Sequence, residues 1–151
     1  MNFHNFLDRQ KTEDRRAFIV YFKAKSGKTK FAKQIEKSRL DVYYLDLQKF
    51  TLRHPHIFTS YNFFELKSFL LDIKVDQSVI LIDNPDFLFN IWVKKDEIEF
   101  ENWLKIQLRS PGVTEKTYVF FVQNDPFFEN LKLINSHSES RVIPLNNFES
   151  L

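Results

Sequence analysis

The chain has 151 residues, of which 43% are hydrophobic and 28% are charged, and this composition is typical of one compact globular domain. It has no cysteine, which excludes disulfide bonds, thiolate zinc sites and a cysteine nucleophile, and which fits a reducing compartment. The formal net charge is only +2, so any nucleic acid would have to be bound by a local patch and not by the overall field.

The sequence gives no sign of export or membrane insertion. No apolar run approaches the roughly 18 residues that are needed to cross a bilayer. Residues 1–16 are too polar for the apolar core of a signal peptide, and we expect them to form a short helix or a loose arm. We therefore predict a cytoplasmic protein without membrane contacts, in which residues 17–151 form a single domain.

From residue 17 onward, short apolar runs alternate with amphipathic stretches. Buried strands are predicted at residues 17–22, 42–47, 78–82, 117–122 and 142–145. Helices are predicted after Gly27 and at residues 62–74, 96–109 and 127–134. Strands that are apolar throughout and alternate with helices are typical of a parallel sheet covered on both faces. The expected fold is therefore α/β, a three-layer α/β/α sandwich with a mainly parallel five-stranded sheet.

Aromatic residues are unusually abundant, with 18 phenylalanines in the chain. They gather at Phe63 and Phe64, at residues 87–92, and at Phe127 and Phe128. This is more aromatic surface than one small sheet is expected to bury. We therefore predict that part of it forms an interface with another copy of the chain or with a larger partner.

A phosphate-binding loop is predicted between the first strand and the helix that follows it. Ser-Gly-Lys-Thr occupies residues 26–29, and Gly27 is one of only two glycines. In a P-loop, successive backbone N–H groups surround phosphate oxygens, the lysine reaches the β- and γ-phosphates, and the hydroxyl binds Mg²⁺. Lys28 and Thr29 would take these last two roles. The alternative is a simple helix start on a basic surface, since the motif expects a glycine where this chain has Phe22.

The third predicted strand ends in a carboxylate. Residues 79–82 are aliphatic, and Asp83 follows them at the carboxyl edge of the expected sheet. At that edge Asp83 would hold the Mg²⁺ that it shares with Thr29. The alternative is a turn opener, because Asn84 and Pro85 come next. The order of the two motifs along the chain favours the metal site.

Together these motifs resemble Walker A and Walker B of the P-loop NTPases, and residues 83–86 are similar to the Asp-Glu-x-Asp string of AAA+ ATPases. The resemblance implies a P-loop NTPase fold with ATP and Mg²⁺ as cofactors. In that family the glutamate after the metal-binding aspartate polarises the attacking water. Here Asn84 stands at that position and cannot accept a proton, so hydrolysis would need Asp86 or a partner to supply the carboxylate. The residues that the resemblance assigns to nucleotide binding are Lys23, Ala24, Lys25, Ser26, Gly27, Lys28, Thr29 and Lys30.

Two further positions extend the resemblance. Asn124 follows the fourth strand, where AAA+ proteins carry the polar sensor that contacts the γ-phosphate, although an amide there also caps helices. Arg141 precedes the fifth strand, where relatives often carry an arginine finger for a neighbouring subunit, although a solvated arginine is the simpler interpretation. In its size, its motif layout and the expected lack of a helical lid, the chain is most similar to the BrxF family, the small P-loop components of type 3 BREX phage-defence systems.

The sequence thus predicts an ATP-binding protein that acts in a homo-oligomer or a larger defence complex, with an ATPase activity that is slow in isolation. The alternative is a nucleotide-independent adaptor that keeps the fold and binds a protein or DNA. Positive charge gathers around the loop and its helix, as expected for a phosphate-rich ligand, for a passing DNA backbone, or for a solvated helix face. The lysines concerned are Lys23, Lys25, Lys28, Lys30, Lys33 and Lys37.

Overall fold

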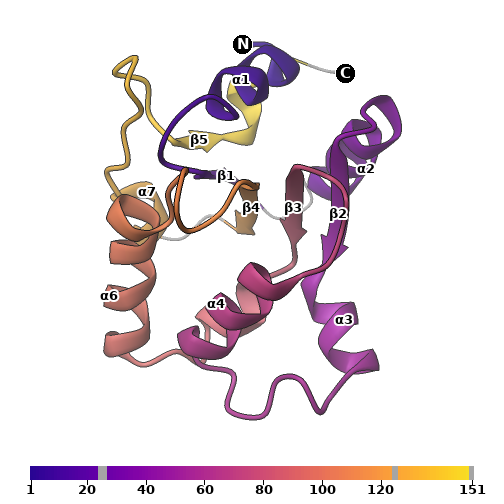
Figure 1. Cartoon of the computed structure of the whole chain (residues 1–151), viewed down its shortest axis with the longest axis vertical. Coiled ribbons are helices and arrows are strands. Elements are labelled where there is room, and N and C mark those ends of the chain that lie inside the picture. Colours follow the sequence, from indigo (N-terminus) through magenta and orange to yellow (C-terminus); the bar gives the residue numbers. More distant parts are fainter. Residues whose placement is uncertain (24–26, 124–125, 150–151) are drawn as a thin grey trace.

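The computed structural model describes residues 1–23, 27–123 and 126–149, and within them five strands form one sheet in which every pairing is parallel (Figure 1). The strand order is β2-β3-β4-β1-β5. The strands are β1 (Ala17–Phe22), β2 (Val42–Asp46), β3 (Val79–Asp83), β4 (Thr117–Gln123) and β5 (Val142–Pro144). The predicted α/β fold with a five-stranded sheet is confirmed, and each predicted strand is present within one or two residues of its expected bounds.

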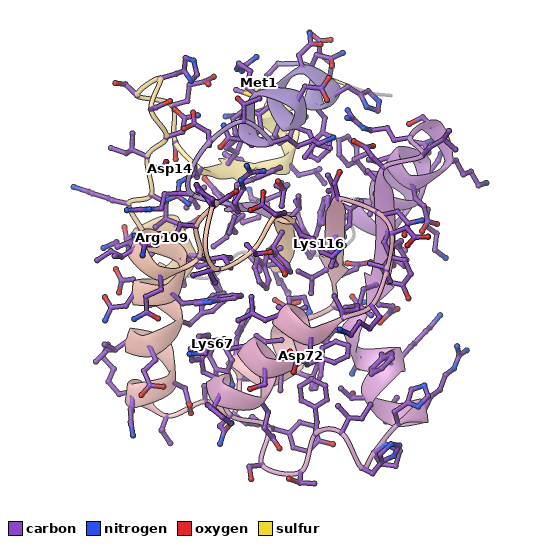
Figure 2. All side chains as sticks on the ribbon, in the orientation of Figure 1. Met1, Asp14, Lys67, Asp72, Arg109 and Lys116 are labelled. Atoms are coloured by element: carbon purple, nitrogen blue, oxygen red, sulfur yellow. The ribbon has the colours of Figure 1, made fainter. Side chains whose placement is uncertain are left out.

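Helices connect the strands and cover both faces of the sheet (Figures 1 and 2). On one face lie α1 (Phe3–Gln10) and α2 (Lys28–Ser38). The other face is covered by α4 (Phe63–Asp72), α6 (Lys94–Asn102) with the π-helical turn η1 (Trp103–Gln107), and the short α5 (Asp86–Phe89) and α7 (Pro126–Glu129). The remaining elements are α3 (Leu47–Arg53), directly after β2, and the 3-10 turn η2 (Leu145–Asn147). In the described part of the chain, every helix is too short or too polar to span a membrane.

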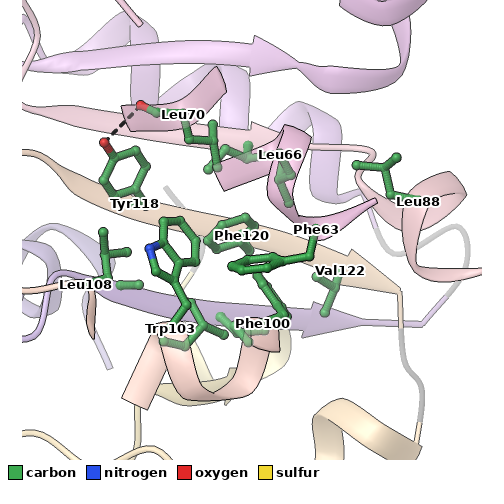
Figure 3. Packing of buried hydrophobic residues seen from close by; sticks show 14 of the residues in the cluster. Phe63, Leu66, Leu70, Leu88, Phe100, Trp103, Leu108, Tyr118, Phe120 and Val122 are labelled. Atoms are coloured by element: carbon green, nitrogen blue, oxygen red, sulfur yellow. Dashed lines mark hydrogen bonds between the residues drawn. The ribbon is translucent and has the colours of Figure 1, made fainter. Parts of the chain in front are cut away.

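The larger core cluster contains most of the aromatic side chains (Figure 3). Phe63 packs edge-on against Trp103 with ring centroids 5.6 Å apart, and Phe100 packs against Phe120 at 5.4 Å. Most of these aromatic side chains pack between the sheet and helices α4 to α6, so little aromatic surface is left for the predicted interface, which stays a prediction. Phe64, which is 65% exposed, is an exception.

The N-terminal segment forms a helix that packs on the sheet. Phe3, Phe6 and Leu7 on α1 are fully buried. The ring of Phe6 lies 5.0 Å from that of Phe18 on β1, in an edge-on contact. Burying aromatic side chains removes a large apolar area from water, and this fixes α1 against the sheet.

Two helices were not predicted from the sequence. The second strand was expected to continue to residue 47, but Asp46 ends it, because its carboxylate accepts the N–H of Lys49 at 3.1 Å and thereby caps α3. The turn predicted after Asp83 passes through Asn84 and Pro85 and leads into the short helix α5. Both short helices begin at the carboxyl edge of the sheet, α3 directly after Asp46 and α5 three residues after Asp83.

The two edge strands of the sheet are both protected. On β2, the backbone N–H of Tyr44 donates to the Glu36 carboxylate of α2 at 2.9 Å. On β5, Pro144 has no N–H to offer.

Charged side chains tie α1 to the loop between α2 and β2. The Arg39 guanidinium donates to both carboxylate oxygens of Asp41 at 2.9 and 3.0 Å, and Lys11 Nζ lies 2.5 Å from the same carboxylate. The hydrogen bonds from Arg39, supported by Lys11, hold the pKa of Asp41 well below its usual range, although partial burial opposes them.

We predict that Asp41→Asn lowers the free energy of unfolding by about 1–3 kcal/mol at pH 7. Because the folded-state pKa of Asp41 is depressed, its contribution is fully present above about pH 4 and is lost as the pH falls through the folded pKa. Urea unfolding of both proteins at pH 7 and pH 3 measures this difference, which should shrink in acid. Exposed Asp72→Asn is the control and should change little at either pH. A difference that stays constant or grows in acid would contradict the prediction.

Candidate functional site

The candidate site lies at the carboxyl ends of β1, β2 and β3. Gly27 caps the N-terminus of α2 with φ 80°, in the left-handed region that favours glycine. The strand ends on the other side of the site are in register, with Asp46 of β2 beside Asp83 of β3. β1 leads into α2 on one face of the sheet, whereas β3 and β4 lead to helices on the other face. Where the connecting helices diverge in this way, the carboxyl ends of the strands border a crevice, and open α/β sheets bind their ligands there.

The centre of the site is the carboxylate of Asp83, which is fully buried. It accepts hydrogen bonds from Lys28 Nζ, from Thr29 Oγ1 at 3.0 Å and from the Tyr44 hydroxyl at 2.5 Å. The backbone N–H of Asn84 donates to it as well, at 3.0 Å. A buried carboxylate is tolerated only when it is paired and hydrogen-bonded in this way. Lys28, Thr29 and Asp83, which the motifs singled out, are therefore in direct contact.

Asn84 extends the network towards β2. Its side-chain oxygen accepts from Lys28 Nζ, and its Nδ2 donates to the Asp46 carboxylate at 3.1 Å. Its backbone has φ 55°, a conformation that asparagine adopts more readily than most residues. Asn84 therefore bridges the lysine and the second acid of the site.

Asp86 binds the neighbouring strand. Its Oδ1 accepts the backbone N–H of Gln123, the last residue of β4, at 2.8 Å. Burial raises the pKa of Asp86 above its usual value, while the Gln123 hydrogen bond and the charge of Lys28 oppose the rise. Asp86 thus lies near the candidate site, with one oxygen engaged in holding the start of α5 to the end of β4.

Phe22 stands where the P-loop motif has its first glycine. Its ring is packed beneath the Lys28 ammonium, with Nζ 5.0 Å from the ring centroid, a cation–π distance. Lys23 follows at the end of β1, is exposed, and lines a cavity of about 350 Å³ together with Phe22 and Glu129. Lys30 points outward from α2 and is exposed. The other predicted residues, Ala24, Lys25, Ser26 and Asn124, lie outside the described residues.

Arg141 does not belong to this site, and its expected role as an arginine finger is not supported. It is only 2% exposed and lies near the start of β1, at the end of the sheet opposite Asp83. Its guanidinium donates to the carbonyl oxygens of Ala17 at 2.8 Å, Leu104 at 3.2 Å and Ile134 at 3.3 Å. A side chain held by three carbonyl groups inside its own subunit cannot extend into a neighbour. The alternative of a solvated surface arginine is also wrong.

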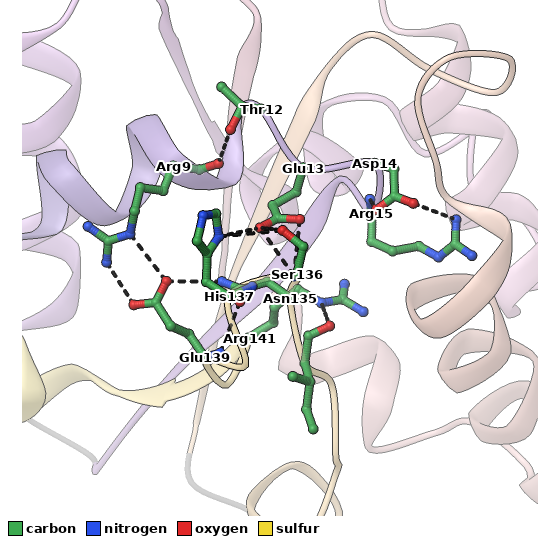
Figure 4. A network of polar contacts seen from close by, with 11 residues as sticks. Arg9, Thr12, Glu13, Asp14, Arg15, Asn135, Ser136, His137, Glu139 and Arg141 are labelled. Carbon is green, nitrogen blue, oxygen red and sulfur yellow. Dashed lines mark hydrogen bonds and ion pairs between the residues drawn. The ribbon is translucent and has the colours of Figure 1, made fainter.

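Arg141 instead anchors the loop before β5. Figure 4 shows it beside a polar network in which the buried Glu13 accepts from the Ser136 hydroxyl at 2.7 Å. Burial, and then the nearby Arg15, lower the pKa of Arg141 to about 10, so its guanidinium remains charged at neutral pH. The role of Arg141 is therefore structural.

The donor set fits Mg²⁺ and a polyphosphate. The Thr29 hydroxyl and the Asp83 carboxylate are the hard oxygen ligands that Mg²⁺ prefers, and Lys28 in the first turn of α2 is placed to pair with phosphate. Across residues 1–23, 27–123 and 126–149, no group of three or more His, Asp or Glu side chains could hold a metal ion. A Mg²⁺ ion at this site would therefore take its remaining ligands from phosphate and water, as is usual for this cation.

Two residues of the site were not predicted from the sequence. Tyr44 and Asp46 lie on β2, and neither follows a recognised motif. The only available signal was that Asp46 ends a predicted strand, as Asp83 does. Burial and the hydrogen bond to Asp83 raise the pKa of Tyr44, so its hydroxyl remains a proton donor to the carboxylate.

Comparison of the chain with protein-family models, with curated proteins and with solved structures gave no match.

We predict that Tyr44→Phe destabilises the protein by about 1–3 kcal/mol, because Asp83 loses one of the donors that compensate for its burial. Tyr43→Phe is the matched control on the same strand, since the Tyr43 hydroxyl has no hydrogen-bond partner within the described part of the chain. Thermal and urea unfolding measure both variants. Equal effects of the two substitutions would show that the hydroxyl of Tyr44 does not stabilise Asp83.

Arg141→Ala should lower the free energy of unfolding by about 2–4 kcal/mol, because three carbonyl groups lose a charged donor and a cavity remains. Exposed Arg109→Ala should cost less than about 0.5 kcal/mol. If Arg141→Ala leaves stability intact but abolishes an activity of the assembled protein, Arg141 acts as an arginine finger and its structural role is refuted.

Proposed function

We propose that this chain is an ATP-binding P-loop protein of the AAA+-like type. The observation that carries the proposal is the convergence of Lys28 and Thr29, from the first turn of α2, on Asp83 at the end of β3. Asp83 is 54 or more positions from Lys28 and Thr29 in the sequence, and no structural need of a small sheet requires a lysine, a hydroxyl and a buried acid at one point.

The order of the strands supports the same assignment. β4 lies between β1, which leads into the candidate loop, and β3, which carries the acid. The crevice at the carboxyl ends of such strands is where open α/β sheets bind ligands. The central strands β1, β3 and β4 are buried along almost their whole length, so the strand ends are held at fixed positions on which a ligand site can be built.

In this proposal each residue has a distinct task. Lys28 exchanges its contacts with Asp83 and Asn84 for the β- and γ-phosphates of ATP. Thr29 and Asp83 hold Mg²⁺, which when bound neutralises charge on the phosphates. Tyr44 remains a donor to Asp83 and keeps its second oxygen oriented. Phe22 supports the lysine from below.

Turnover by the isolated chain is expected to be slow. Asn84 offers no base, and Asp86 has one oxygen engaged with the backbone of β4. Arg141 is held inside the subunit and supplies no charge to a neighbouring site. A fast ATPase would need groups from a partner, and the resemblance to BrxF proteins would place that partner in a phage-defence complex.

A nucleotide-independent adaptor is the second candidate. The observation that favours it is the closed arrangement of the site, in which Lys28 already has two side-chain partners. If these contacts are too stable to exchange for phosphate, the site serves only to hold the strand ends together.

We predict saturable, Mg²⁺-dependent binding of ATP and of a non-hydrolysable analogue in calorimetric titration. Lys28→Ala should weaken binding about 10- to 100-fold, because it removes a charge-assisted contact to phosphate. Lys37→Ala, in the last turn of the same helix, is the matched control and should leave binding unchanged.

The titration also separates the two candidates. Absence of ATP binding by the folded wild-type protein would exclude the P-loop function and favour the adaptor. Equal weakening by Lys28→Ala and Lys37→Ala would indicate a diffuse attraction to the basic helix and not a phosphate site.

A further inference from the structure

A second concave site lies beside the first, at the β2 edge of the sheet. It is a cavity of about 340 Å³ between α2 and α3, and we call it the β2 pocket. Figure 1 shows α2 and α3 flanking this strand at one end of the sheet. Its wall begins at Thr29 and Asp46 and continues outward to Lys33, Lys49 and Arg53. It shares Thr29, Tyr44 and Asp46 with the candidate nucleotide site, whereas Lys33, Lys49 and Arg53 belong to this pocket alone.

The β2 pocket has an excess of positive charge. Lys33, Lys49 and Arg53 are exposed, and none forms a salt bridge among the residues that the structure describes. The nearby acids Asp46 and Glu36 accept hydrogen bonds from uncharged groups and keep their negative charge, but the three cations outnumber them. An excess of cations around a concavity favours an anionic ligand.

Aromatic rings form the rest of the wall. Tyr43, Tyr44 and Phe50 line the β2 pocket, and the His54 ring lies 4.5 Å from that of Phe50 with an interplanar angle of 34°. Lys33 Nζ is 5.9 Å from the centroid of Tyr44. Cations alternating with flat rings are typical of surfaces that bind a phosphate backbone and stack unpaired bases.

The positive charge continues beyond the pocket along α2. Lys30, Lys33 and Lys37 follow one another at spacings of three and four residues, so they share one face of the helix. Lys30 and Lys37 are exposed and, like Lys33, have no salt-bridge partner within the described residues. A polyanion longer than the pocket would therefore meet further cations, which a free mononucleotide would not use.

We propose that the β2 pocket and the lysine face of α2 bind single-stranded nucleic acid. One nucleotide occupies the pocket, its base against the aromatic wall and its phosphate near Lys49 and Arg53, and the backbone continues along α2. A duplex is excluded from the pocket because its bases are stacked and paired, whereas a cavity of about 340 Å³ has the size of a single small ligand. The proposal does not depend on ATP binding.

The test is fluorescence anisotropy with a labelled mixed-sequence single strand of DNA, titrated with the full chain at several salt concentrations. Lys49→Gln/Arg53→Gln should raise Kd about tenfold and lower the salt slope by about 1.4, the value for two lost phosphate contacts on a single strand. Lys94→Gln/Lys95→Gln, on α6, removes the same charge from exposed positions and should change Kd less than about twofold. Lys33→Gln/Lys37→Gln is a second test variant, in case the first does not fold.

The proposal is overturned if the wild type does not bind the single strand or binds the corresponding duplex with equal affinity. It is also overturned if a free mononucleotide at equal nucleotide concentration competes fully, or if Lys94→Gln/Lys95→Gln loses as much affinity as Lys49→Gln/Arg53→Gln. Calorimetric titration with ATP on the same samples keeps the two proposals apart. A protein that binds the strand but not ATP refutes only the P-loop function, and one that binds ATP but not the strand refutes only the β2 pocket.

Discussion

The candidate site depends on satisfying one fully buried carboxylate. Asp83 is placed at the end of a strand that has no exposed surface, and its charge is compensated by Lys28, Thr29 and Tyr44 from two other elements. Removing any one donor leaves a buried charge partly unpaired, and that is more costly than losing an ordinary surface contact. The same requirement brings α2, β2 and β3 into fixed positions, so the stability of the sheet edge and the geometry of the site have a common origin.

The contacts of Lys28 and Asp83 also determine which existing interactions a ligand would have to replace. Phosphate must compete with a carboxylate and an amide for Lys28, and a cation at Asp83 must compete with the lysine. When a polyphosphate binds together with a divalent ion, Lys28 pairs with phosphate and Asp83 pairs with the cation. Either component alone would leave Lys28 or Asp83 without a partner. Under the proposed function, the combined ligand is therefore expected to bind more tightly than either component.

Much of this architecture could be predicted from the sequence, because buried strands appear as short apolar runs and helices as amphipathic stretches with apolar residues every three to four positions. The two motifs lie directly after predicted strands, so their place in the fold could be predicted too. The predicted contact of Lys28 and Thr29 with Asp83 follows from parallel strands ending at one edge. Tyr44 and Asp46 could not be found, because their role comes from the register between β2 and β3, which one sequence does not encode locally. Arg141 was misassigned for a related reason: a position just before a strand does not reveal whether its side chain points into the protein, as this one does towards Ala17.

The hydrogen bond from Tyr44 to Glu36 has a consequence for how copies of the protein meet. An exposed edge strand is a template to which another chain can add its own strand, and this is a common route to aggregation. On the edge strand β2, the Glu36 carboxylate accepts the backbone N–H of Tyr44, and on the edge strand β5, Pro144 has no backbone N–H. Growth of the sheet from molecule to molecule is thereby discouraged, and any ordered assembly would have to be built from side-chain surfaces.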